Sequence, residues 1–128
     1  MDGSAVEVWN AATALGPSGT AGPDVPTGTA HLARLLRFHN AAMSGELGFA
    51  LEVTPADQLE AVASAADYLD LVDVARLVRR LAADGRDFEL AEGLNDAYCQ
   101  ATGENRVGDS EVERAFLRAF AASPGDFR

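Results

Sequence analysis

His31, His39 and Cys99 are the residues of this sequence whose chemistry suits metal binding or nucleophilic catalysis. The two histidines are eight positions apart on one predicted helix. That spacing separates them by about 12 Å of rise and about 80° of rotation, so they do not share a metal ion. His39 falls on an apolar stripe, where a hydrogen-bonded core histidine is favoured over a ligand, and Cys99 is expected to be a packed thiol. We therefore predict no catalytic, cofactor-binding or metal-binding residue.

Acidic residues dominate the charge of the chain, with 20 Asp and Glu against 10 Arg and a formal net charge of −10. Six of the acids fall at predicted helix starts, where capping and the helix dipole explain them: Asp57, Asp70, Asp87, Asp109, Glu111 and Glu113. Five others form outward stripes on two predicted helices: Glu60, Asp67, Glu89, Glu92 and Asp96.

These five residues are predicted to form a partner-binding acidic face. Neighbours at helical spacing are roughly 5–6 Å apart, close to the spacing of phosphates along a nucleic-acid strand, so a basic protein could bind this surface in place of nucleic acid. Arg76, Arg79 and Arg80 oppose this prediction, because they make the outward side of the intervening helix basic. Dipole complementarity also accounts for these arginines.

Length, charge and cysteine content limit the class of protein. A chain of 128 residues suggests one domain with a real core. Its negative charge argues against direct binding to nucleic acid or to an anionic membrane. A single cysteine excludes an internal disulfide and fits a reducing cytoplasm. We see no signal peptide and no apolar run of transmembrane length, and therefore expect a cytoplasmic protein.

Apolar periodicity predicts an all-α fold, a compact single-domain bundle of about five or six helices around a central αα-hairpin over residues 54–82. Thr54 is expected to cap the first helix of the hairpin and Asp70 the second. The residues expected to be largely buried are these: Leu59, Val62, Leu77, Val78, Leu94, Phe116 and Phe120. Two other residues are also predicted to lie on inward-facing apolar stripes: Met43 on the helix that ends at about residue 43, and Ala97 on the helix over 87–102.

The remaining chain divides at about residue 28. Residues 1–28 are predicted to be a short helix, which docks through Trp9, and a Gly/Pro-rich linker; residues 29–128 are the helical domain. Thr29 is expected to cap a helix that glycines interrupt after about residue 43, and Phe49 and Leu51 are expected to plug one end of the core. Later helices should run over 87–102, with Gly103 as the stop, and from a cap at residue 109 or 110 to about 122. Phe127 should fold back.

The order of several short motifs resembles the DMP19-like family, small bacterial helical proteins of the DNA-mimic type. The motifs are residues 40–49 (NAAMSGELGF), 68–71 (YLDL), 94–98 (LNDAY) and 123–127 (SPGDF), so the match covers about residues 29–127. The Asn-Gly-Gly segment of the family is Ser44-Gly45-Glu46 here, which departs from the pattern. The namesake is a DNA mimic that binds a basic transcription regulator, often as a dimer. The resemblance therefore implies an acidic protein-binding face and allows a homodimer.

These observations predict a cytoplasmic protein-interaction module with a basic partner. Its sharpest form is a DNA mimic that occupies the nucleic-acid site of that partner. One alternative is an immunity- or antitoxin-type binding protein without DNA mimicry, and the least favoured is a small enzyme that uses Cys99 or His39. Salt separates the first two, because charge mimicry weakens steeply as salt rises and an apolar interface does not.

Overall fold

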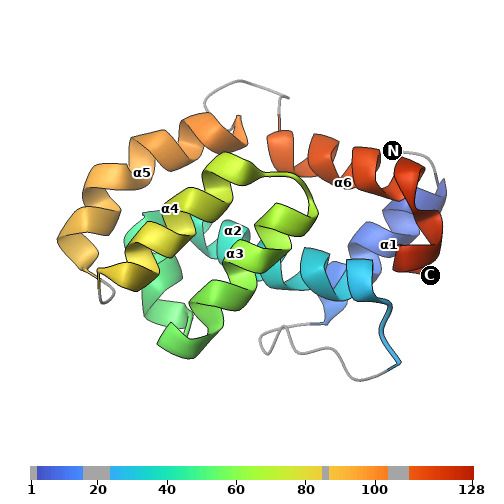
Figure 1. Cartoon of the computed structure of the whole chain (residues 1–128), viewed down its shortest axis with the longest axis horizontal. Coiled ribbons are helices and arrows are strands. Elements are labelled where there is room, and N and C mark those ends of the chain that lie inside the picture. Colours follow the sequence, from blue (N-terminus) through green and yellow to red (C-terminus); the bar gives the residue numbers. More distant parts are fainter. Residues whose placement is uncertain (1–2, 16–23, 85–86, 104–109) are drawn as a thin grey trace.

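The computed structural model describes residues 3–15, 24–84, 87–103 and 110–128, and within these ranges it contains helices and no strand (Figure 1). The elements are α1 Gly3–Ala14, α2 Thr27–Val53, η1 Ala56–Gln58, α3 Leu59–Tyr68, α4 Val72–Ala83, α5 Phe88–Thr102, α6 Glu111–Ala122 and η2 Pro124–Phe127. The two η elements are 3₁₀ turns. The predicted all-α bundle is confirmed.

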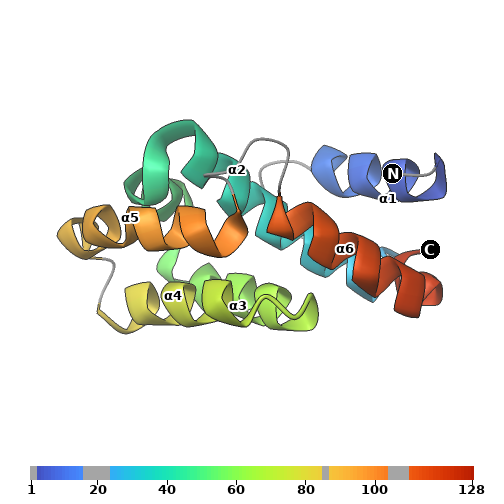
Figure 2. The same ribbon diagram turned by 90° about the horizontal axis from the view of Figure 1, so that it is seen from above.

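Helix α2 is the element that touches most of the others. It packs against α1, α3, α5 and η2, while α3 and α4 form the predicted αα-hairpin and α5 lies against α4. Figures 1 and 2 show α1 and α6 at one end of the molecule and α3, α4 and α5 at the other, with α2 running between them. The hairpin therefore covers one part of α2, and α2 organises the bundle.

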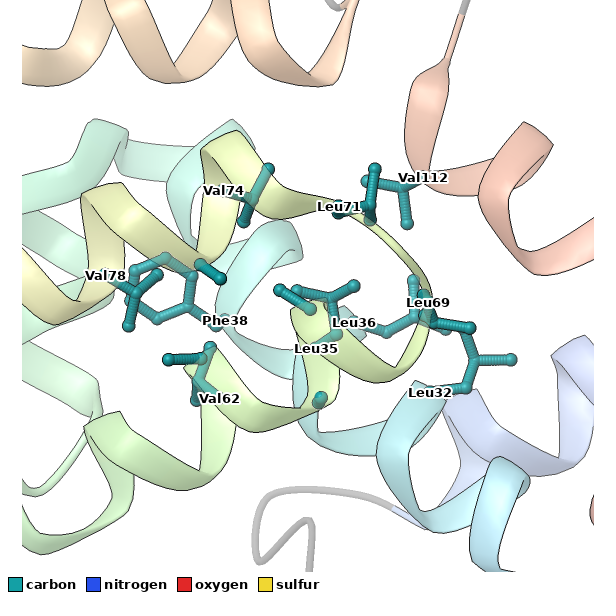
Figure 3. Packing of buried hydrophobic residues seen from close by; sticks show 14 of the residues in the cluster. Leu32, Leu35, Leu36, Phe38, Val62, Leu69, Leu71, Val74, Val78 and Val112 are labelled. Atoms are coloured by element: carbon teal, nitrogen blue, oxygen red, sulfur yellow. The ribbon is translucent and has the colours of Figure 1, made fainter. Parts of the chain in front are cut away.

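The core forms where α2 meets the hairpin. Figure 3 shows Phe38, Val62 and Val78, from α2, α3 and α4, pointing into one space, and all three are buried. Leu71 and Val112 face each other where the hairpin turn meets α6 (Figure 3). The predicted burial is confirmed for five residues: Leu59, Val62, Val78, Phe116 and Phe120.

Four residues on the predicted stripes lie nearer the surface than expected. Leu77 and Leu94 are only half-buried, and Met43 and Ala97 are exposed. Each sits at the edge of an otherwise correct apolar face. A helix turns by about 100° per residue, so an edge position is covered only where a neighbouring helix happens to reach it.

Three predicted caps are wrong. Thr54 is the buried C-cap of α2, and the hairpin begins after Pro55 with the 3₁₀ turn η1. Asp70 has a φ of 63° and lies in the turn between α3 and α4, because α4 begins only at Val72. Thr29 lies inside α2, where its hydroxyl donates to the Phe127 carbonyl at 2.9 Å instead of capping.

The termini of α5 and α6 follow the sequence signals. The Asp87 carboxylate accepts hydrogen bonds from the backbone N–H of Glu89 and of Leu90, and Gly103 ends α5 with a left-handed φ of 73°. The Ser110 hydroxyl accepts from Glu113 N–H at the start of α6. Asp109, the other candidate for this cap, lies outside the described residues.

Both chain ends of the described structure pack on the bundle. Trp9 of α1 is half-buried, with its ring 5.6 Å from the Phe116 ring, so the predicted docking of this helix is confirmed. Phe127 folds back and is buried, as predicted. Most of the predicted linker, residues 16–23, lies outside the described residues, and residues 27 and 28 already belong to α2.

Helix α2 is kinked at the glycine-containing segment that the sequence marks as an interruption. Gly45 has φ −145° and ψ 28°, and Glu46 has φ 67° and ψ 179°, after which a second helical segment runs to Val53. The kink turns Phe49 outward, where it is 39% exposed. The prediction that Phe49 plugs the core is therefore wrong, whereas the same prediction for Leu51, two residues on, is confirmed by its full burial.

Candidate functional site

Helix α5 carries three of the five carboxylates predicted to bind a partner: Glu89, Glu92 and Asp96. The buried Ala91 and Tyr98 fix the rotation of the helix against the bundle. At 3.6 residues per turn the three carboxylates lie within about 60° of one another on the opposite side. All three are exposed, and none forms an ion pair with another residue of the described ranges. The outward acidic stripe of α5 is thus present.

The other two predicted carboxylates are engaged within the hairpin. Arg79 of α4 forms ion pairs with Glu60 at 3.0 Å and with Asp67 at 2.6 Å, and both acids belong to α3. The hydrogen bonds that Arg79 donates to Glu60, and in second place to Asp67, raise the pKa of its guanidinium. All three side chains are substantially exposed, and ion pairs at the surface contribute little to stability. The positive charge of Arg79 nevertheless cancels part of the negative charge of Glu60 and Asp67.

The five carboxylates therefore do not form one array. A two-row acidic surface requires α3 to lie beside α5, and the structure instead packs α4 against both helices (Figure 1). Arg79 stands between the two carboxylates of α3. The predicted acidic face thus divides into an ion-paired part, Glu60 and Asp67, and an open row on α5. The sequence could not reveal this division, because the ion pairs of Arg79 depend on which neighbouring helix its side chain faces, and that helix is α3.

His39 and Tyr98 join α2 to α5 inside the core. Tyr98 is fully buried, His39 is 6% exposed, and the Tyr98 hydroxyl lies 2.8 Å from His39 Nδ1. A buried tyrosine hydroxyl needs such a partner, since leaving it unpaired costs free energy. The predicted hydrogen-bonded core histidine is confirmed. Cys99, the residue after Tyr98, is half-buried rather than enclosed.

The other histidine belongs to a cluster that holds the C-terminal turn η2. His31 stacks on Tyr68 with ring centres 4.5 Å apart, and the Tyr68 hydroxyl donates to Asp126 Oδ2 at 2.8 Å. Burial, and then the nearby charge of Arg34, lowers the pKa of His31. Burial, followed by the hydrogen bond to Asp126 and its charge, raises the pKa of Tyr68 to about 12. These contacts make the cluster a structural one, although the buried Nδ1 atom of His31 has no hydrogen-bond partner among the described residues.

The described part of the chain contains neither a cluster of metal ligands nor a membrane-spanning helix. Among these residues no three His, Cys, Asp or Glu side chains come close enough to hold a metal ion. No described helix combines the length and apolar character needed to cross a membrane.

A groove of about 400 Å³ lies between α4 and α5, and its charged residues, Asp73 and Arg76, pair with each other at 3.7 Å.

Two exposed phenylalanines are the surface feature that sequence analysis missed. Phe49 is 39% exposed and Phe88, the first residue of α5, is 52% exposed. Phe88 lies against α2 at Gly48, where a Cβ would come within 4.0 Å of its ring. The available signal was the pair of glycines, Gly45 and Gly48, since a kink there rotates the following residues away from the expected face.

Comparisons of the chain with protein-family models, with curated proteins and with solved structures found no match. The resemblance to the DMP19-like family thus stays a prediction that rests on the short motifs alone.

Proposed function

We propose that this chain is a cytoplasmic protein-interaction module, without enzymatic activity of its own, that binds a basic partner protein through the exposed side of α5. The observation that carries the proposal is the open row of Glu89, Glu92 and Asp96. These carboxylates have no ion-pair partner in the described residues, unlike Glu60 and Asp67, which share Arg79. Their field is therefore directed at solvent, where it can steer a positively charged protein into contact.

DNA mimicry is the sharper form of this proposal. It would require the partner to accept the α5 row in its nucleic-acid site, with Glu60 and Asp67 contributing less because Arg79 neutralises part of their charge. An immunity- or antitoxin-type partner without a nucleic-acid site is the alternative. Competition by duplex DNA distinguishes the two, since only a mimic shares its site with DNA.

The test is a charge reversal on α5 with a control of equal charge. The variant carries Glu89→Arg, Glu92→Arg and Asp96→Arg. The control carries Glu7→Arg, Asp24→Arg and Asp57→Arg, which reverse three exposed acids on other elements and change the net charge by the same amount. Each protein, with wild type, is used to capture partners from an extract of the cells that produce it, and binding of a captured basic protein is then measured at increasing salt.

The α5 variant should lose the basic partner, whereas the control should retain it with a small loss in on-rate, because distant charges act mainly through steering. Both variants should keep wild-type helicity and cooperative unfolding. Equal losses in the two variants would mean that only total charge matters, and retention by the α5 variant would contradict the proposal. Release of the partner by duplex DNA would favour mimicry over the alternative.

A further inference from the structure

The six phenylalanines of the chain divide into two groups with different surroundings. Phe38, Phe116, Phe120 and Phe127 are at most 8% exposed, whereas Phe49 and Phe88 are 39% and 52% exposed. Isolated exposed apolar residues are ordinary on protein surfaces and need no explanation. Phe88, however, lies near Gly48, the residue that precedes Phe49, although Phe49 and Phe88 are 39 positions apart in the sequence.

Gly48 connects the two aromatic side chains. The Phe88 ring lies so close to this glycine that an added Cβ would be 4.0 Å from its Cδ1 atom, and Phe49 is the next residue in α2. The α2 kink sets this arrangement, and Gly45 also crowds against Phe49, since a Cβ on Gly45 would lie 2.7 Å from that of Phe49. The backbone there includes Glu46 at φ 67° and ψ 179°, a conformation that non-glycine residues rarely adopt.

Carboxylates flank each of the two phenylalanines in the sequence. Glu52 follows Phe49 by three positions and Glu92 follows Phe88 by four, spacings that place each acid on the same side of its helix as the ring. Across the described stretches 45–53 and 87–92 every charged residue is acidic, and the exposed ones include Glu46 and Glu89. We call this surface the kink patch, and define it by six residues: Glu46, Phe49, Glu52, Phe88, Glu89 and Glu92.

We infer that the kink patch binds an amphipathic basic helix of the partner protein, with apolar side chains against Phe49 and Phe88 and Arg or Lys side chains against the surrounding carboxylates. An apolar centre with a charged rim is the layout of a protein interface. The charge selects the occupant: nucleic acid and anionic lipid are repelled, and a second copy of this chain would present the same acidic rim. This inference rests on the proposed function and specifies its partner.

Two synthetic peptides of identical Leu, Lys, Arg and Ala composition separate the apolar contribution from the electrostatic one. The first places Leu at positions i, i+3, i+4 and i+7 on one helix face, and the second scatters the same residues. Binding of labelled peptide is measured by fluorescence anisotropy to wild type, to the double variant Phe49→Ala/Phe88→Ala and to Val72→Ala. Val72 is a suitable control because it is 45% exposed beside the acidic Asp70 and Asp73, yet lies on α4 outside the patch.

Wild type should bind the amphipathic peptide about tenfold more tightly than the scattered one, as expected for two aromatic contacts at the centre of an interface. The double phenylalanine variant should lose this preference and keep its salt-dependent binding of the scattered peptide, while Val72→Ala should behave as wild type. Equal binding of both peptides by wild type, or a preference that survives in the double variant, would overturn the kink patch and leave the acidic proposal standing. Failure of both peptides to bind at low salt would overturn both.

Because Phe49 and Phe88 are exposed, the double variant Phe49→Ala/Phe88→Ala should fold as wild type does. Thermal unfolding of the double variant should remain within a few degrees of wild type, because large effects come from buried side chains. Wild type alone should be monomeric by light scattering. Dimerisation of wild type that the double variant abolishes would identify a second copy as the occupant and contradict the basic helix.

Discussion

The side-chain oxygen of Asn95 accepts a hydrogen bond from the backbone N–H of Leu47 at 3.2 Å. Leu47 is the first residue after the two non-helical residues of the α2 kink, Gly45 and Glu46, so this bond is made where the second helical segment begins. Asn95 therefore acts as a cap supplied by a neighbouring helix. The bond ties α5, with its acidic row, to the segment that presents Phe49, so the two parts of the candidate interface are held in one arrangement.

Removal of this cap should destabilise the protein modestly. Asn95→Ala should lower the free energy of unfolding by about 1 kcal/mol, the usual cost of losing an N-terminal cap. Asn95→Asp keeps an acceptor at the same position and should recover most of the loss. Urea unfolding followed by circular dichroism measures both. Equal stabilities of the alanine and aspartate variants would show that the hydrogen bond is unimportant.

The strained backbone at the kink predicts a stabilising substitution. Glu46 has φ 67° and ψ 179°, a region that glycine occupies without penalty. Glu46→Gly should therefore raise the free energy of unfolding by roughly 1 kcal/mol once the greater flexibility of glycine in the unfolded chain is subtracted. Glu52→Gly, within the regular helix that follows, should instead lower it by about 1 kcal/mol. A loss of stability in Glu46→Gly would contradict the strain.

Burial along α4 should set the cost of truncating its leucines. Leu81 is fully buried, whereas Leu77, one turn earlier, is half-buried. Leu81→Ala should cost about 2–5 kcal/mol, the range for buried leucines, and Leu77→Ala should cost clearly less. Thermal or urea unfolding of the two variants measures the difference. The reverse order would mean that the rotation of α4 is wrong.

Stability at alkaline pH should depend on Tyr68. Its pKa is raised from 10.0 to about 12, first by burial and then by its hydrogen bond to Asp126 and the charge of that acid. The folded state therefore favours the protonated phenol. This contribution is complete below pH 10, where Tyr68 stays protonated in both states, and is lost as the pH rises from about 10 through 12.

Tyr68→Phe should remove this part of the pH dependence. Urea unfolding of wild type and variant at a series of pH values measures it, and the difference isolates Tyr68 from the other tyrosine, Tyr98. The stability of the two proteins should converge, or the variant should become the more stable, as the pH passes through 12. A constant difference from pH 9 to 12 would contradict the raised pKa.

The sequence was sufficient to predict a residue's structural role where local signals and burial agree. The Asp87 cap, the Gly103 stop and the His39 position on an apolar stripe were each predicted, because each depends on neighbours within one helix. Thr29 and Thr54 failed as caps for the opposite reason. Both look like cap residues locally. Packing, however, starts α2 at Thr27, so that Thr29 lies inside the helix, and continues the helix to Val53, so that Thr54 follows its last residue.

The candidate site was predicted only in part. Helical spacing was enough to place Glu89, Glu92 and Asp96 on the outer side of α5. The engagement of Glu60 and Asp67 by Arg79 depends on contacts between helices, which no local pattern encodes. Phe49 was misplaced because its direction follows from the backbone torsions at Gly45 and Glu46, which no local sequence pattern specifies.

Backbone amide chemical-shift mapping with the amphipathic basic peptide tests the central claim most directly. At low salt the largest shifts should fall on residues 46–52 and 88–96, the stretches that contain the kink patch and the acidic row of α5, and they should diminish as salt rises. Glu60 and Asp67, paired with Arg79, should shift little. Shifts centred on α1 or α3, or spread evenly over all acidic residues, would contradict the assignment of the binding surface to α5 and the α2 kink.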